Sequence, residues 1–172
     1  MLFRSQSVPI VLDADALNLI ANHTYLATAV ANRVSETVLT PHVGEAARML
    51  ACNNETVTQN RLEIAIKLAK RFKATCVLKG AGTVIAQDED HYFINTSGNV
   101  GLASGGTGDV LSGIIGSLMA QGLAAIDAAK LGVYVHGAAA DALVKKGVGP
   151  IGLTASEVIL AVRNILQSIQ QK

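Results

Sequence analysis

A glycine-rich stretch that runs directly into a helix is the feature that most constrains the fold of this 172-residue chain. Residues 95–109 contain five glycines, and from Val110 the apolar residues recur at the three-and-four spacing of a helix. Glycines let a backbone turn sharply and approach a ligand closely. Unpaired amides collect at a helix N-terminus. Residues 106–109 are therefore predicted to form an anion site at the start of a helix over residues 110–122.

Asp109 ends this stretch and has two interpretations. As a structural residue it caps the helix or supplies an acid to the first turn. As a functional residue it is a carboxylate beside an anion site, where it accepts a proton from a hydroxyl while the amides hold a phosphate. The spacing alone favours the structural interpretation, because short glycine-rich matches are common.

The composition predicts a single domain over residues 1–172 with a substantial core. Half of the residues are apolar, 16% are charged and the net charge is +1, without a run of like charges. This pattern gives no indication of a nucleic-acid or membrane partner. The N-terminus lacks the apolar core of a signal peptide, and Cys52 and Cys76 have no partner at metal-ligand spacing. We expect a cytoplasmic protein, and the high apolar content favours a homo-oligomer.

Short apolar and β-branched runs predict five strands, at residues 8–12, 36–40, 75–78, 84–86 and 92–94. Helical patterns connect the first three strands, as parallel pairing requires, and the acidic turn between the last two predicts a hairpin. One helix is predicted over residues 46–51. Another is predicted over residues 55–72, with its charges, Arg61 included, facing solvent. Two further helices follow the glycine-rich segment and its helix, over residues 123–146 and 154–170. The order predicts an α/β sandwich with a mostly parallel sheet and a late antiparallel hairpin.

Polar residues follow the first three predicted strands, at the edge of the sheet where ligands bind in open parallel sheets. Asp13 and Asp15 follow the first strand, and the pattern favours Asp15 as a helix N-cap. His42 follows the second in a loop, where ligand contact is an option although a lone histidine is more often structural. Lys79 follows the third, where a charged hairpin edge and a nucleotide contact fit equally well. His136 lies on an alanine-rich helix face and is expected to pack in the core.

Four motifs occur in a fixed order, namely VLDADALN (residues 11–18), LTPHVGE (39–45), VLKGAGTV (77–84) and GLASGGTGDVLSG (101–113). Together they resemble the ADP- or ATP-dependent NAD(P)H-hydrate dehydratases of the ribokinase-like superfamily, which also form the C-terminal half of bifunctional repair proteins. The resemblance implies a ribokinase-like three-layer sandwich. It also implies a lyase that uses ADP or ATP, with Mg²⁺, to restore NADH or NADPH from their hydrated forms. The hydroxyl would be phosphorylated, and phosphate would then be eliminated.

The resemblance further implies a role for each matching residue. Asp109 would be the base at the substrate hydroxyl, and Asp109 and His42 would contact the hydrated nicotinamide. The anion hole for the transferred phosphoryl group would consist of Gly106, Thr107 and Gly108. The nucleotide would be held by Gly108 together with Lys79, Gly80, Ala81, Gly82 and Thr83. Further candidate contacts are Asp13, Asp15, Asn18, Glu45 and Asn99, and no metal ligand is assigned.

The chain departs from the family pattern in two ways. Val43 stands where the family usually has proline, a mild change to loop stiffness. A family domain has about 270 residues, and roughly its first hundred have no counterpart here, so we expect an N-terminally truncated fold with an exposed edge at residues 8–12. Two other functions fit the motifs less completely. One is a ribokinase-like kinase of a vitamin-precursor alcohol, and the other is a non-catalytic remnant that binds an adenine nucleotide.

Overall fold

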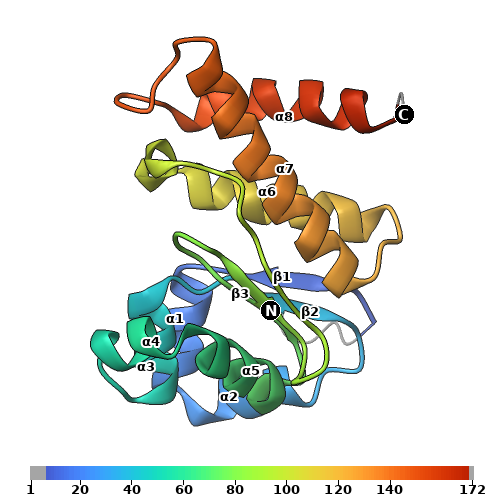
Figure 1. Ribbon diagram of the computed structural model, residues 1–172. Coiled ribbons are helices and arrows are strands. Elements are labelled where there is room, and N and C mark those ends of the chain that lie inside the picture. Colours follow the sequence, from blue (N-terminus) through green and yellow to red (C-terminus); the bar gives the residue numbers. More distant parts are fainter. Residues whose placement is uncertain (1–6, 171–172) are drawn as a thin grey trace.

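The computed structural model of the chain describes residues 7–170, which form a five-stranded sheet with helices on both faces (Figure 1). The strands lie in chain order and are β1 (Ile10–Leu12), β2 (Thr37–Leu39), β3 (Thr75–Leu78), β4 (Val84–Ala86) and β5 (Tyr92–Ile94). β1, β2 and β3 pair in parallel, and β4 is antiparallel to both β3 and β5. All strands except β4 therefore run in one direction, and the predicted late hairpin is present.

Side chains of the strands alternate between the two faces of the sheet, and each face has its own core. Leu39 and Leu78 belong to the buried cluster that the sheet forms with the helices before residue 73. Val38 and Val77 belong to the cluster formed with the helices after residue 106. Because both faces are covered, the central strands are apolar at nearly every position. That is why short unbroken apolar runs marked them in the sequence.

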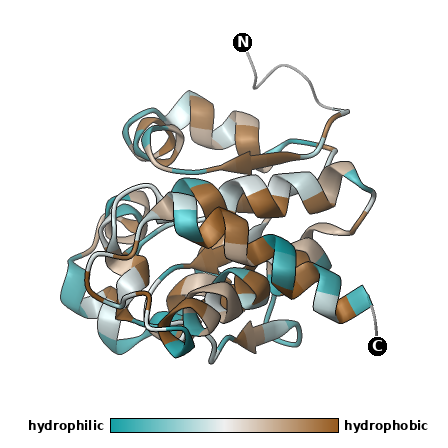
Figure 2. Ribbon diagram, turned by 90° about the horizontal axis from the view of Figure 1, so that it is seen from above, coloured by the Kyte–Doolittle hydropathy of each residue, from teal (hydrophilic) through white to brown (hydrophobic). Residues whose placement is uncertain are grey.

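The helices form the two outer layers of a three-layer sandwich (Figure 1). The helices on one face are α1 (Asp15–Asn22), α2 (Thr24–Ala31), α3 (Val43–Leu50), α4 (Asn54–Gln59) and α5 (Arg61–Phe72). On the opposite face α6 (Thr107–Ala120) and α7 (Ala125–Lys145) pack on the sheet, and α8 (Ala155–Gln170) packs on α7. Figure 2 shows that hydrophobic and hydrophilic residues alternate around these helices, as expected of helices with one buried side.

Helix boundaries differ from the sequence predictions at several places, and α6 for example begins at Thr107 rather than at residue 110. Asp15 was expected to cap α1, but Ala14 is the N-cap and the Asp15 side chain makes no capping hydrogen bond. α3 begins at Val43 rather than at residue 46, because the His42 side chain caps it. The single helix predicted over residues 55–72 is two helices, since Asn60 is not helical and its side-chain amide bonds to the preceding turn.

β1 forms one edge of the sheet among the described residues, and α6 packs over one of its faces. Within residues 7–170 no helix has both the length and the apolarity needed to cross a bilayer. Both cysteines are free thiols, with Cys76 buried and Cys52 half-buried.

Candidate functional site

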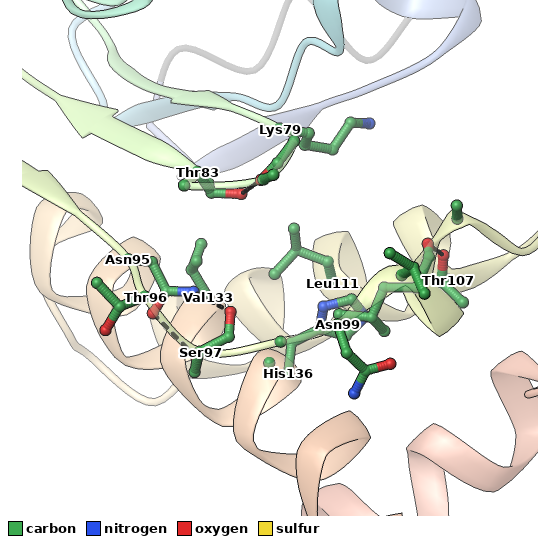
Figure 3. Close-up of a pocket in the computed structure, with 18 of the residues that line it drawn as sticks. Lys79, Thr83, Asn95, Thr96, Ser97, Asn99, Thr107, Leu111, Val133 and His136 are labelled. Carbon is green, nitrogen blue, oxygen red and sulfur yellow. Dashed lines mark hydrogen bonds between the residues drawn. The ribbon is translucent and has the colours of Figure 1, made fainter. Parts of the chain in front are cut away.

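The candidate site lies beyond the carboxyl ends of the parallel strands, where a pocket of about 620 Å³ opens (Figure 3). One wall is the turn between β3 and β4, residues 79–83, and the opposite wall is the segment 95–99 that follows β5. α6 and α7 close the pocket between these walls through Leu111, Val133 and His136. A cavity of this size suits a small-molecule ligand.

The β3–β4 turn can follow its tight course because two of its residues are glycines. Gly80 and Gly82 have φ angles of 144° and 65°, which residues with a Cβ rarely adopt. The Thr83 hydroxyl closes the turn by donating to the Gly80 carbonyl at 2.9 Å. The backbone amides of Gly80, Ala81 and Gly82 donate no hydrogen bond to any residue between 7 and 170. The turn therefore presents unpaired donors.

The opposite wall is anchored to α7 by an aspartate and a glycine. Asp141 accepts hydrogen bonds from the Gly98 amide at 2.8 Å and from the Asn99 side chain at 2.9 Å. Gly137 permits the close approach, because an added Cβ would lie only 2.3 Å from Ser97 Oγ. Asn99 lines the pocket, but its amide group is held by Asp141. Asp141 could not be predicted from the sequence, since nothing in an alanine-rich helix shows which residue meets a loop 43 positions earlier.

α6 begins against the same pocket, as the glycine-rich stretch predicts. Gly106 is its N-cap with a φ of 84°, and Thr107 and Gly108 line the pocket. The buried Thr107 hydroxyl lies 2.7 and 2.8 Å from two carbonyl oxygens of the preceding turn. The amides of Gly106, Gly108 and Asp109 have no acceptor in the described part of the chain. Together with the positive end of the helix dipole they can hold an anion.

Asp109 is exposed, and its side chain makes no hydrogen bond or ion pair with any described residue. Asp109 does not cap the helix, because Gly106 occupies that position, but it is the first-turn acid that the structural interpretation also allowed. Asp109 is the third residue of the helix and directly follows Gly108, but it does not itself line the pocket. A carboxylate without a partner beside unpaired amides is available as a proton acceptor.

Lys79 connects the pocket to the ends of β1 and β2. Its Nζ lies 2.7 Å from Asp13 Oδ1 and 4.0 Å from Glu45 Oε2, while Ser112 Oγ donates to Asp13 Oδ2 at 2.7 Å. A Cβ placed on Gly108 would be 3.6 Å from Lys79 Nζ, so the ammonium lies beside the anion site. Burial alone would raise the pKa of Asp13, but the hydrogen bonds from Lys79 and Ser112 outweigh it and lower that pKa. Asp13 therefore stays ionised and holds the lysine in place.

His42, Asp15 and Asn18 lie outside the pocket lining. His42 Nδ1 accepts hydrogen bonds from two amides in the first turn of α3, at 3.0 and 3.4 Å, and Glu45 Oε2 accepts from the His42 amide at 2.8 Å. This reciprocal pair is a capping box. Because Nδ1 is an acceptor, the ring proton of neutral His42 is on Nε2, 3.3 Å from Glu45 Oε1. Asn18 bonds to Arg48 and joins α1 to α3.

Two further residues contact the pocket or its walls contrary to expectation. His136 is buried in α7 as predicted, but it also lines the pocket, and its Nε2 has no partner among residues 7–170. Burial lowers the pKa of His136 to about 4, although a hydrogen bond with the Thr107 backbone has a smaller, opposite effect.

The prediction that Arg61 faces solvent is wrong, because it is half-buried and donates to carbonyls of the β3–β4 turn. Arg71 likewise donates to the Met49 carbonyl.

Comparisons with known sequences identify relatives of this chain. A family model described as NAD(P)H-hydrate dehydratase matches residues 1–162. The bifunctional NAD(P)H-hydrate repair enzyme Nnr of Escherichia coli K12 is 44% identical over 92% of this chain and 29% of that protein. The ADP-dependent (S)-NAD(P)H-hydrate dehydratase of Neisseria meningitidis serogroup B is 43% identical over 90% of this chain and 52% of that protein. The chain thus spans about half or less of the length of these relatives.

A solved structure shares the fold. The ADP/ATP-dependent NAD(P)H-hydrate dehydratase from Bacillus subtilis, co-crystallized with ATP/Mg²⁺, matches with a TM-score of 0.81 at 34% identity. The match covers 93% of this chain and 55% of that chain. The three-layer α/β fold expected from the four motifs is confirmed.

Proposed function

The chain belongs to the NAD(P)H-hydrate dehydratase family, and on that premise we propose that it returns hydrated NADH or NADPH to NAD(P)H with the use of ADP or ATP. The observation that carries the proposal is that the unpaired amides of residues 80–82 and of Gly108 lie at one pocket beside the Lys79 ammonium. Such a set of donors suits the phosphates of a nucleotide. The Neisseria relative is ADP-dependent by name, and the Bacillus structure was obtained with ATP/Mg²⁺.

The shape of the pocket favours one orientation of the nucleotide. Its volume of about 620 Å³ and its apolar Leu111 and Val133 suit the base and ribose. The start of α6 and Lys79 lie at one end, where the phosphates would meet the helix dipole and the ammonium. Residues 79–83 and Gly108 would then all contact the nucleotide.

Asp109 is proposed as the base in the transfer step. The substrate hydroxyl oxygen attacks the terminal phosphorus, its proton passes to Asp109, and the bond from that phosphorus to the rest of the nucleotide breaks. The amides of Gly106, Thr107 and Gly108 would stabilise the charge on the transferred phosphoryl group. The C–O bond of the nicotinamide ring then breaks as phosphate leaves. A proton is lost from the neighbouring ring carbon, and the double bond between the two carbons is restored. The products are NAD(P)H, phosphate and the shortened nucleotide.

Mg²⁺ is proposed to supply counter-charge to the phosphates. Residues 7–170 contain no group of three or more acidic, histidine or cysteine side chains arranged to hold a metal. Mg²⁺ commonly binds nucleotide phosphates, waters and one or two carboxylates rather than a protein cage. The donor set near Lys79 fits this mode, with Asp13 and Glu45 as carboxylates 2.7 and 4.0 Å from the Lys79 ammonium.

The hydrated nicotinamide is proposed to bind on the exposed side of Asp109, with His42 as a further contact. His42 uses both ring nitrogens within α3, yet 53% of its side chain is exposed. It can therefore contact the substrate through the face of its ring while it caps the helix. Asp15 and Asn18 lie at the start of the neighbouring α1, and we keep them as candidate contacts on this side.

We also propose a cytoplasmic, homo-oligomeric protein in which one domain carries this site. The cytoplasm is proposed because reduced nicotinamide cofactors and adenine nucleotides are used there. Exposed apolar side chains on β5, Tyr92, Phe93 and Ile94, support association between copies. Light scattering of the purified protein would test the oligomer, and a monomer at micromolar concentration would contradict it.

The decisive experiment combines turnover with binding. Recovery of the absorbance of reduced nicotinamide is followed with hydrated NADH, Mg²⁺ and either ADP or ATP, and calorimetry measures binding of both nucleotides. Turnover with either nucleotide supports the proposal. Nucleotide binding without turnover identifies a nucleotide-binding remnant, and phosphorylation of hydroxyethylthiazole identifies a vitamin-precursor kinase. Absence of both binding and turnover contradicts all of these functions.

A further inference from the structure

The guanidinium of Arg61 lies beneath the β3–β4 turn and bonds to three of its carbonyl groups. Nη2 donates to the carbonyl oxygens of Leu78 at 3.0 Å, of Gly82 at 3.3 Å and of Lys79 at 3.5 Å. Nη1 also reaches the Lys79 carbonyl at 3.5 Å. The helix break at Asn60 makes Arg61 the first residue of α5, and this position brings its side chain under the turn.

These contacts determine which way the peptide groups of the turn face. In a trans peptide the carbonyl of one residue and the amide of the next point in opposite directions. The Lys79 carbonyl faces Arg61, so the Gly80 amide faces away from it. The Leu78 carbonyl shows the same relation, because the Lys79 amide points away to the Pro41 carbonyl at 2.8 Å. Gly80 lines the pocket and Arg61 does not.

Gly80 and Arg61 are matched to each other. A Cβ on Gly80 would lie 2.9 Å from Arg61 Nη1, and the φ of 144° is unfavourable for any other residue. The planar guanidinium of arginine carries several donors and can bind more than one carbonyl at once. The single ammonium of a lysine cannot bind the carbonyls in the same arrangement. The turn and the arginine therefore form one unit.

We propose that Arg61 is a positioning residue of the nucleotide site: by binding the carbonyls of Leu78, Lys79 and Gly82 on one side of the turn, it presents the Gly80 amide to an adenine nucleotide on the other. The inference rests on the proposed function, because it requires that the pocket take a nucleotide. It assigns a binding role to a residue that contacts no ligand itself. It also explains why a charged side chain at the start of α5 is half-buried.

The test compares Arg61→Met with Arg71→Met, a matched control on the same helix. Arg71 also donates to a backbone carbonyl, that of Met49 at 2.6 Å, but it lies outside the pocket lining. Both substitutions remove a charged hydrogen bond, so both should lower the melting temperature. Only Arg61→Met should weaken ADP and ATP binding in calorimetry, by about tenfold. In turnover the same variant should raise KM for the nucleotide more than it lowers kcat.

Hydrogen exchange provides a readout that stability alone would not change. Bound ADP should slow exchange of the Gly80 amide in the wild-type protein and much less in Arg61→Met. Arg61→Lys, which keeps the charge, provides a second variant if the methionine variant does not fold, and it should recover only part of the affinity. Nucleotide affinity within twofold of wild type in Arg61→Met, or in Arg61→Lys where only that variant folds, would overturn the inference. A wild-type protein that binds no nucleotide would overturn the proposed function and this inference with it.

Discussion

The pocket differs in how its geometry is maintained from two exposed residues outside its lining, Asp109 and His42, here called the exposed group. Each pocket wall is held by a charged side chain from a helix, Arg61 from one outer layer and Asp141 from the other. Asp109 has no side-chain partner among the described residues, and His42 is held only by its own helix. The proposed nucleotide side of the site is thus preorganised by tertiary contacts, whereas the proposed proton acceptor is open to the solvent. Substitutions in the walls should change nucleotide affinity, and substitutions in the exposed group should change turnover.

The largest effect is expected for Asp109→Asn, which should lower kcat by roughly 10²- to 10⁴-fold because the amide cannot accept the proton. Nucleotide affinity and melting temperature should remain close to wild type, since Asp109 bonds to no described residue. Asp127→Asn is the control, because Asp127 is also an exposed acid in the first turn of a helix. Steady-state kinetics and calorimetry measure both quantities. Turnover within a few-fold of wild type in Asp109→Asn would exclude it as the base.

Gly137→Ala should break the pocket wall at residues 95–99. Its Cβ would lie 2.3 Å from Ser97 Oγ and 2.7 Å from the Ser97 backbone, so the segment must shift. We expect a loss of about 1–3 kcal/mol in the free energy of unfolding and weaker nucleotide binding. Gly113→Ala in α6 is the matched control. An added Cβ there meets nothing within 4 Å, so the variant should gain about 0.5–1 kcal/mol. Urea unfolding measures both, and equal stability of the two variants would contradict the close packing.

Acid should destabilise the protein through His136. Burial lowers the pKa of His136 to about 4 in the folded protein, from 6.5. Between these pH values the unfolded chain binds more protons than the folded one, so the free energy of unfolding falls as the pH falls from 6.5 towards 4. Between pH 7 and pH 5 the loss should be about 2 kcal/mol. Urea unfolding at both pH values should show a smaller loss in His136→Gln but not in His23→Gln, a change at an exposed histidine. An unchanged pH dependence in His136→Gln would contradict the burial of this group.

The smallest effect is expected for substitutions of His42, which separate its role as the cap of α3 from its proposed contact with the substrate. His42→Ala removes the cap of α3 and should cost about 1 kcal/mol of stability, whereas His42→Asn can cap the helix and should cost less. If His42 also contacts the hydrated nicotinamide, both variants should raise KM for that substrate and leave nucleotide affinity unchanged. Full recovery of KM in His42→Asn would limit His42 to its structural role.

Local patterns were sufficient for most of the fold. The strands were recognisable as short apolar runs because both faces of the sheet are buried, and the start of α6 was recognisable because its glycines precede a helical periodicity. Helix ends were predicted less well. At Asn60 and His42 the deciding interaction is a side chain bonded to a nearby backbone group, and such bonds follow no period. Aspartate is a residue type that commonly caps helices, but Ala14 rather than Asp15 occupies the N-cap position of α1.

The sequence by itself determined the class of fold, the family, the glycine turns at Gly80 and Gly106, and the order of the polar residues along the strand ends. Only the tertiary structure decided which side chains hold those turns in place. Lys79 bonds to Asp13 across a sequence separation of 66 residues. Asp141 bonds to Gly98 across 43 residues, and Arg61 bonds to Leu78 across 17. The physical reason is that such bonds depend on how helices pack on the sheet, and packing brings together residues that no local pattern relates. The anion site at α6 could therefore be predicted from the sequence, but the positioning of the β3–β4 turn by a half-buried arginine could not.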